Sequence, residues 1–378
     1  MAIVLAASFA CNGVKAPTNP NPGKPLPGMQ DMYVIAANGS WDLVGFAPSL
    51  TAGATGALTG VHHAGAATAS HASASAKAAM DSIFTTFVIV GPPSGTDLVM
   101  PTYEAFDQAG NAWMSVRGTA FDGSIVEYTP AAQKLGDTVP PSVAIGGVQY
   151  PEGMAFDQAG NLWVLDAQAN RLVEYTPAQL AHSGSPAPTS IMSLAALDVI
   201  GSTYAAFVLA IDAHGNFWVS ANIQNRPASA AGDSLPNFIV AEFTSSQAEA
   251  GGTPTPVLTI SMPGSFPGGY GPGIAFDSAG NLWTANSDSG TLTKFPASSL
   301  TAGPSPLPTI RIGGVDLAGI SDVGIDPAGV LFAATGYAIV PGAGLFGYLP
   351  SQLTASGSPT PVIVFIPADG ITHLATRP

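Results

Sequence analysis

The chain has 378 residues, of which 46% are apolar and 9% are charged, and this balance excludes a disordered chain, since disorder goes with abundant charge and few apolar side chains. Its 24 acidic and 10 basic residues give a formal net charge of −14. That charge excludes nucleic acid as a partner, because no Lys/Arg stripe is present to neutralise phosphates.

The first segments in chain order predict export. Residues 1–11 are apolar and small up to the single cysteine, Cys11, and residues 12–29 form a tether rich in Pro, Asn and Gly. This arrangement resembles a bacterial lipoprotein signal, which implies lipidation of Cys11 and attachment to the cell envelope. The alternatives are an ordinary cleaved secretory signal or an unstructured tail. One cysteine also excludes an internal disulfide framework.

Residues 30–378 are predicted to form a single domain with an insertion at 51–83. The insertion is rich in Ala, Gly, Ser and Thr and carries His62, His63 and His71. Imidazoles at this spacing are potential Zn or Cu ligands, but low complexity favours a loop with only adventitious metal affinity.

A repeated phrase dominates the rest of the chain. Its copies are AFDQAGNAW from Ala105, AFDQAGNLW from Ala155, AIDAHGNFW from Ala210, AFDSAGNLW from Ala275 and the weaker GIDPAGVLF from Gly324. Asp and Gly in each phrase suit a tight turn between two strands, and the aromatic residue is placed to pack between neighbouring sheets. Two further strand-like phrases follow each copy. A four-stranded unit of this kind buries both faces only by stacking around an axis, which predicts a β-propeller.

The two ends of the chain complete each other in this scheme. Residues 32–50 align with the second and third strands of a repeat but lack an inner strand, and residues 371–377 supply a spare strand. We therefore predict an all-β fold, a six-bladed β-propeller of four-stranded antiparallel blades, in which the C-terminal strand pairs into the N-terminal blade. Phe84–Gly91 would be the outer strand of that blade.

The recurring xGNLWV phrase resembles the NHL-repeat propellers and their SMP-30/gluconolactonase-like and streptogramin-lyase-like relatives. The resemblance covers about 345 residues of the chain and implies fold more than function, because one propeller scaffold hosts many activities. In the SMP-30-like family an early Glu before a Gly is a metal ligand, and Glu152 matches that position. The Asn and Asp ligands that the family has in later blades have no match here.

Functional residues are expected where the repeat is irregular. Glu152 stands where the other repeats have Thr102, Phe207, Pro272 and Ser321. Further candidates in the loops between second and third strands, or on the closing strand, are Arg117, Asp166, Arg171, Asn222, Arg226, Asp288 and His373. The arginines either clamp an anionic ligand or pair with acidic residues on the rim. The recurring Asp and Trp residues are predicted to cap turns and pack between blades.

Besides a structural subunit of a surface assembly, two functions remain open from the sequence. The first is an exported propeller that binds a small molecule or a protein at its loop face without catalysis. The alternative is an enzyme of the lactonase, esterase or lyase type that uses the mouth of the central channel, with a metal or an inner-channel His. We predict no cofactor for the first function, whereas a divalent cation held by Glu152 belongs to the second.

Overall fold

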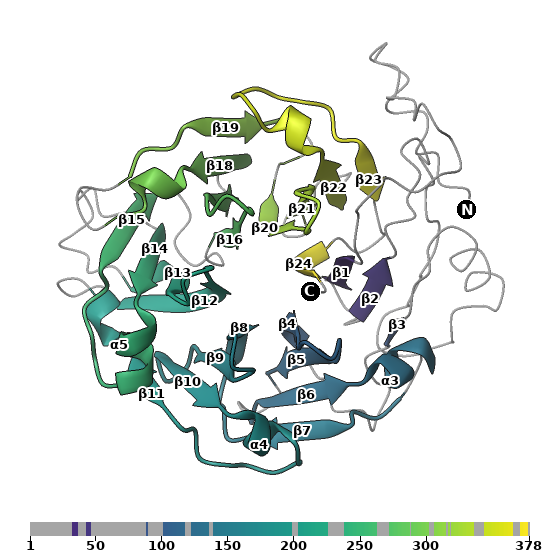
Figure 1. Cartoon of the computed structure of the whole chain (residues 1–378), viewed down its shortest axis with the longest axis vertical. Helices are drawn as coiled ribbons and strands as arrows, with labels where there is room; N and C mark the ends of the chain where they lie inside the picture. Colours follow the sequence, from purple (N-terminus) through teal and green to yellow (C-terminus); the bar gives the residue numbers. More distant parts are fainter. Residues whose placement is uncertain are drawn as a thin grey trace.

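The computed structural model describes residues 32–36, 43–46, 88–89, 101–117, 122–135, 139–198, 203–225, 238–262, 272–287, 289–301, 306–314, 317, 319–335, 344–365 and 371–376. The chain is an all-β propeller with four-stranded antiparallel blades arranged around an axis (Figure 1). The signal-like segment 1–11, the tether 12–29 and the insertion 51–83, with its three histidines, lie outside the described residues.

Five blades are formed by strands consecutive in the chain and are described with most of their side chains. Their strands are β4 (Pro101–Phe106), β5 (Ala112–Val116), β6 (Ser124–Tyr128) and β7 (Val143–Gly146); β8 (Pro151–Phe156), β9 (Leu162–Asp166), β10 (Arg171–Tyr175) and β11 (Ile191–Ser193); β12 (Thr203–Ile211), β13 (Phe217–Asn225), β14 (Phe238–Phe243) and β15 (Leu258–Met262); β16 (Gly273–Phe276), β17 (Leu282–Asn286), β18 (Thr291–Phe295) and β19 (Ile310–Gly313); β20 (Ile320–Ile325), β21 (Leu331–Thr335), β22 (Leu345–Tyr348) and β23 (Ile363–Phe365). The predicted all-β propeller is confirmed.

One more four-stranded sheet joins the two ends of the chain, in the order β24-β1-β2-β3. It contains β1 (Met32–Ala36), β2 (Leu43–Phe46), β3 (Val88–Ile89) and β24 (Ile371–Thr376). Strand β24 pairs antiparallel with β1, with Met32 opposite Thr376 and Ile35 opposite His373.

The repeated turn works as predicted. At Asp157, Oδ1 accepts the backbone N–H of Asn161 at 2.9 Å, while Oδ2 accepts the Asn161 side-chain amide at 2.9 Å and the indole N–H of Trp163 at 3.0 Å. The same bonds recur at Asp107, Asp212 and Asp277. Gly160 closes the turn at φ +82°, where residues with a Cβ are strained.

The repeated tryptophans join adjacent blades. Trp163 is buried and its ring packs edge-to-face on Phe217 of the next blade, with centroids 4.6 Å apart. Trp113 and Trp218 make equivalent contacts with Phe156 and Phe276. These contacts confirm the predicted packing role, and pairs of this geometry contribute about 0.5–1.5 kcal/mol beyond their buried area.

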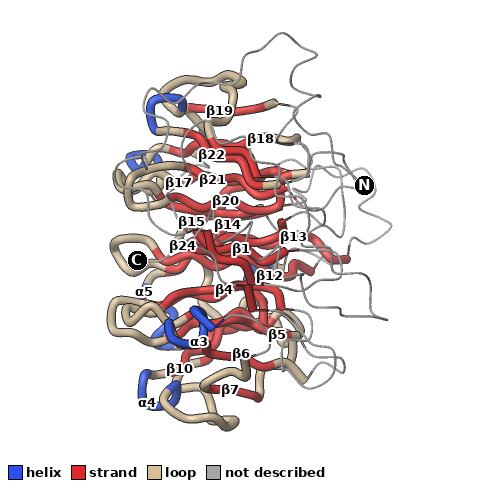
Figure 2. Tube along the Cα trace, turned by 90° about the vertical axis from the view of Figure 1, so that its right-hand side faces the viewer, coloured by secondary structure: helices blue, strands red, loops and turns tan. Residues whose placement is uncertain are grey.

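A helical turn follows the third strand of each of the five blades: α3 (Pro130–Leu135), α4 (Pro177–Leu180), α5 (Ser245–Ala250), η3 (Ala297–Ser299) and η5 (Pro350–Gln352); η1 (Ala195–Leu197) follows β11. The Gln of the second shared phrase holds the next segment, since the Gln179 amide donates to Ala187 O at 2.7 Å and that of Gln247 to Thr255 O at 2.8 Å. Helices α3, α4 and α5 lie along one face of the ring, at the left in Figure 2. We call this the turn face, and the opposite ends of the inner hairpins the open face.

The outer edges of three blades are covered by a Gly from the following blade, which the sequence did not predict. Gly184 bridges Ile145 of β7, Gly252 bridges Met192 of β11 and Gly357 bridges Ile312 of β19, all in parallel orientation. At the first bridge Gly146 N donates to Gly184 O at 2.8 Å, and Gly184 N donates to Ala144 O at 3.0 Å. These bonds satisfy groups that an outer strand would otherwise present for edge-to-edge pairing.

Candidate functional site at the open face

Irregular backbone marks the open ends of the inner strands. The pairing register shifts between Pro101 and Glu104 in β4 and between Pro151 and Met154 in β8. Strands β12 and β20 shift at Ala206/Val208 and Ile320/Asp322. A bulge bends its strand and changes the direction of a side chain, and bulges are frequent beside functional sites.

Glu152 lies inside the bulge of β8, which begins already at Pro151. Its side chain is fully buried. The following Gly153 lets the next blade approach, since a Cβ there would lie 2.6 Å from both Phe207 O and Leu209 N. Gly153 therefore permits the tight packing of β8 against β12 next to the buried Glu152.

Arg117 comes directly after β5 and forms an ion pair with Glu152 Oε1. Its guanidinium lies 4.1 Å from the ring centroid of Tyr150, so the cation is held between a carboxylate and an aromatic face. Burial raises the pKa of Glu152 to about 7 against the opposing effect of Arg117. Within the described residues, Glu152 Oε2 is buried without a hydrogen-bond partner.

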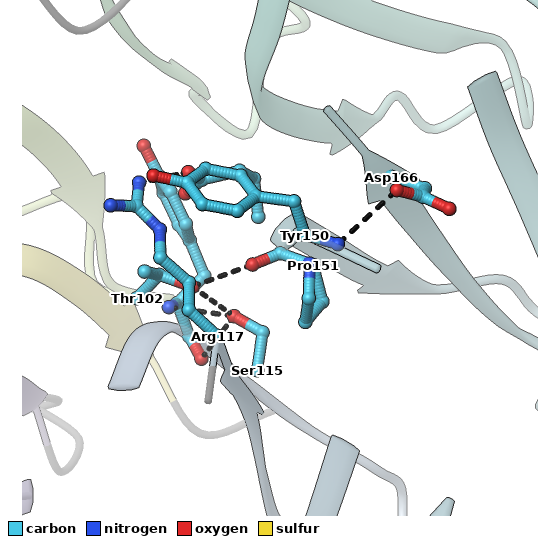
Figure 3. A network of polar contacts seen from close by, with 8 residues as sticks. Thr102, Ser115, Arg117, Tyr150, Pro151 and Asp166 are labelled. Atoms are coloured by element: carbon cyan, nitrogen blue, oxygen red, sulfur yellow. Dashed lines mark hydrogen bonds and ion pairs between the residues drawn. The ribbon is translucent and has the colours of Figure 1, made fainter. Parts of the chain in front are cut away.

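Hydroxyl groups of Thr102 and Ser115 connect the two blades close to Arg117 (Figure 3). Thr102 Oγ1 donates to Pro151 O at 2.8 Å and lies 2.8 Å from Ser115 Oγ. Ser115 Oγ in turn accepts the backbone N–H of Tyr103 at 2.9 Å. The network ties β4 and β5 to the start of β8, which fixes the position from which Tyr150 and Glu152 face Arg117.

Asp166 and Arg171 also pair, at the facing ends of β9 and β10. Asp166 Oδ2 accepts Arg171 Nε at 3.1 Å and Nη2 at 2.9 Å, and its Oδ1 accepts the Tyr150 N–H at 3.3 Å. Asp166 is fully buried while Arg171 is partly exposed. Of the two roles open to these arginines from the sequence, the structure shows pairing with acids for both Arg117 and Arg171.

The remaining candidates are scattered. Asn222 is buried within β13, opposite Phe238 of β14, because β12 and β13 are longer than the other inner hairpins; its expected place in a loop was wrong. His373 lies on β24, and its side chain, like Arg226, Asp288 and Cys11, falls outside the described part. His182 and His214 are exposed.

Sequence reasoning missed a second group of buried acids. Glu104 in β4 and Asp322 in β20 are 6% and 4% exposed. The signal was available: Glu104 occupies a column in which the other blades have Met154, Leu209, Ile274 and Val323. An acid in an otherwise apolar inner column calls for a partner or a ligand.

The metal site implied by the family resemblance does not fit Glu152. Its Oε1 is already paired with a guanidinium, which would repel a cation at the same carboxylate. Among the described residues, no group of three or more His, Cys, Asp or Glu side chains is arranged to hold a metal. No helix in the same residues is long and apolar enough to cross a membrane.

One solved structure among those that resemble this chain supports the fold. A Bacteroides caccae protein of unknown function matches at a TM-score of 0.54 with 11% identity, over 92% of this chain and 99% of that one. A gluconolactonase from Xanthomonas campestris matches at 0.46 with 12% identity, over 74% and 80%. A streptogramin B lyase matches at 0.38 with 12% identity, over 70% and 76%. No family profile and no curated protein matches the sequence.

Proposed function

We propose that this propeller binds a small organic anion, such as a carboxylate, at Arg117 on its open face, without transforming it. The carrying observation is the arrangement of Arg117 between Glu152 and the ring of Tyr150. A guanidinium fixed on two sides loses little freedom when it binds a carboxylate through two parallel hydrogen bonds. Tyr150 is partly exposed, which gives the site an aromatic edge toward solvent.

Protonation of Glu152 compensates for the negative charge that the ligand brings to the site. An anion that takes over the charge of Arg117 leaves Glu152 buried and negative, and a buried carboxylate then takes up a proton. The raised pKa of Glu152, about 7, supports this exchange near neutral pH. Binding is therefore expected to tighten as pH falls from 8 to 6.

A thermal-shift panel of small carboxylates, followed by calorimetry on the best ligand, tests this function. Arg117→Met should abolish binding, whereas Glu152→Gln, which resembles the protonated carboxyl, should retain it and remove its pH dependence. Calorimetry in buffers of different ionisation enthalpy should show proton uptake in the native chain only. Binding that survives Arg117→Met, or takes up no proton, would contradict the proposal.

The same raised pKa favours a second candidate, an acid–base hydrolase or lyase, because a general base works best when its pKa is near the working pH. A lactone and ester hydrolysis screen separates the two. Turnover by the native chain that disappears in Glu152→Gln would establish the enzyme, whereas ligand binding without turnover would favour the binding protein.

We further propose that the terminal sheet closes a six-bladed ring. Contacts of β24 with both β20 and β4 support this, as does the hydrogen bond from Leu374 N to Asp322 Oδ2 at 3.1 Å. Ala375 packs on the apolar cluster of Phe106 and Met114 in the β4–β7 blade. Deletion of residues 366–378 should abolish the soluble monomer, and a deletion variant with unchanged thermal stability would refute closure.

The location proposed is the cell envelope, through a lipid on Cys11, on the strength of residues 1–29 alone. Expression of the full chain in a bacterial host with a labelled fatty acid tests it. The native chain should carry label and sediment with membranes, and Cys11→Ser should carry none. Native protein that carries no label and stays in the soluble fraction would contradict lipidation of Cys11, and the proposal would be reduced to export without a lipid anchor.

A further inference from the structure

The interface between the β12–β15 and β16–β19 blades, which are neighbours in Figure 1, contains buried hydroxyl groups within an apolar cluster. Ser220 of β13 and Thr284 of β17 are both fully buried. Neither Ser220 Oγ nor Thr284 Oγ1 has a hydrogen-bond partner among the described residues. A buried hydroxyl without a partner costs free energy, and buried polar groups in folded proteins are nearly always bonded. These two hydroxyls therefore call for a partner that the described side chains do not supply.

The strand register places both side chains at this one interface. Ser220 lies opposite Val208 of β12 and Val240 of β14, and Thr284 lies opposite Ile274 of β16. The three apolar neighbours belong to a single cluster that spans the two blades. Residues directly opposite each other on adjacent strands point to the same face of the sheet. Ser220 and Thr284 therefore face the same interface from its two sides.

Thr293 of β18 adds a third hydroxyl on the β16–β19 side. It lies directly opposite Thr284 and is 7% exposed. Residues in such a pair have Cβ atoms about 4.5–5.5 Å apart, so the two threonines are neighbours on one face.

The interfaces on either side have apolar residues at the equivalent positions of the repeat. These positions are two residues after the repeated aromatic of one blade, one residue after that of the next blade, and two residues before the aromatic that ends the next blade's third strand. They hold Leu165, Val219 and Ala241 at the preceding interface, and Ala285, Ala333 and Phe346 at the following one. Only the interface between the β12–β15 and β16–β19 blades combines Ser, Thr and Thr among the five blades that are described with most of their side chains.

Ser115 shows what a hydroxyl needs in the position of Ser220. It occupies the same place in the β4–β7 blade, where its Oγ lies 2.8 Å from Thr102 Oγ1 and accepts the N–H of Tyr103 at 2.9 Å. The β12–β15 blade has Phe207 in the place of Thr102. The inner strand beside Ser220 therefore lacks the hydroxyl that serves Ser115.

We propose that Ser220, Thr284 and Thr293 bind an ordered water molecule between these two blades. A buried water typically makes about three hydrogen bonds to polar groups that the protein leaves unsatisfied, and a hydroxyl can donate as well as accept. Asn222 and Asn286 lie two residues further along the same strands toward the open face and are also buried, so they extend the polar lining in that direction. The water site does not depend on the ligand proposed at Arg117.

A crystal structure of the full chain at about 1.8 Å or better tests the site directly. We expect one water within about 3.2 Å of both Ser220 Oγ and Thr284 Oγ1. Hydroxyls that bond only to protein groups, or density for a molecule larger than water, would overturn the proposal.

Thermal unfolding of Thr284→Val tests it through the sign of the change, because Val keeps the shape of Thr and removes little but the hydroxyl. Loss of a hydroxyl that binds water should lower the thermal midpoint by about 2 °C, whereas loss of an unbonded buried hydroxyl would raise it. Ser220→Ala should also lower the midpoint. The double variant should lose less than the sum, because one water serves both groups.

Thr259→Val is the matched control, since Thr259 is partly exposed on the outer strand β15. It should leave the thermal midpoint within about 1 °C of the native value. A Thr284→Val variant that melts above the native chain would overturn the proposal, and so would losses in Ser220→Ala and Thr284→Val that simply add.

Discussion

The turn face and the open face of this propeller are built from opposite ends of the same hairpins, but they treat buried polar groups differently. At the turn face, Asp157 receives three hydrogen bonds from its own blade. At the open face, Glu152 is bonded through one oxygen to Arg117 of the preceding blade, and Glu104 has no hydrogen-bond partner within the described residues. Buried polar residues that recur in every blade are therefore hydrogen-bonded within their own blade. Buried polar residues at irregular positions need a partner from another blade or a ligand.

The difference follows from geometry. A turn of five residues contains its own donors, so each blade can satisfy its Asp without help. Inner strands at the open face diverge into loops, and a bulge turns their side chains toward other blades. Polar residues at the open face find hydrogen-bond or ion-pair partners only in other blades. A substitution at this face therefore affects more than one blade, whereas a substitution at a turn affects its own blade.

The largest effect is expected for Gly153→Ala at the open face. The new Cβ would lie 2.6 Å from backbone atoms Phe207 O and Leu209 N, which cannot give way as a flexible side chain can. We expect a loss of about 3 kcal/mol or more in the free energy of unfolding, measured by denaturant titration. The control is Gly357→Ala, whose Cβ meets no atom within 4 Å. Equal stability of the two variants would contradict the close packing of β8 on β12.

Next in size is Arg117→Met, which leaves Glu152 buried without its cation. Removal of one partner of a buried pair costs about 3–5 kcal/mol, and the double variant with Glu152→Gln should recover most of it. The folded-state pKa of Glu152, about 7, is above its ordinary 4.5. The stability it contributes is therefore present below pH 4.5 and lost as pH rises through 7, and Arg117→Met should shift that loss to higher pH. Chemical denaturation at pH 5, 7 and 9 measures both effects.

A smaller effect is expected at the turn face from Asp157→Ala. The change removes the acceptor for two Asn161 groups and for the Trp163 indole; Asn161 is partly exposed and can bond to water instead, whereas Trp163 is buried. We expect a loss of about 2 kcal/mol in the free energy of unfolding. Asp122→Ala, at an exposed position, is the control for lost charge. If Asp157→Ala lowered the free energy of unfolding as much as Arg117→Met, the proposed difference in bonding between the turn face and the open face would be wrong.

The smallest effect is expected for Arg171→Met. Arg171 pairs with Asp166 but is itself partly exposed, so water screens the pair and replaces the lost donors. We expect a loss of about 1 kcal/mol or less, reduced further in 1 M salt. A cost above that of Asp157→Ala would show that this pair belongs with Arg117 and Glu152 as an interior contact.

Much of the fold was predictable from the repeats. The repeated phrase from Ala155 falls at the end of β8 and the beginning of β9, with the predicted turn between the two strands. The repeated Asp and Trp roles were also predicted, because each acts on residues within its own phrase or at the same position of the next. The Gly184 type of edge bridge was missed, since nothing local to Gly184 indicates its partner in β7.

Less of the candidate site was predictable. Glu152, Arg117, Asp166 and Arg171 were singled out as irregular residues, but only the structure paired them across blades. Tyr150 was missed because it lies outside the repeated phrases. Glu104 and Asp322 were missed because they sit 218 positions apart on inner strands that appeared purely structural. Their columns in the repeat, otherwise apolar or small, were the available signal.

The sequence by itself determined an all-β propeller, its strand order within each blade and the composition of its turns, because short-range periodicity and turn chemistry specify these locally. Only the tertiary structure decided which polar residues of different blades meet, since bulges and the curvature of the ring bring together side chains that no spacing relates. The sheet formed by β24 and β1 combines the two: the sequence supplied a missing strand and a spare one, and the fold placed Asp322 and Glu104 on either side of it.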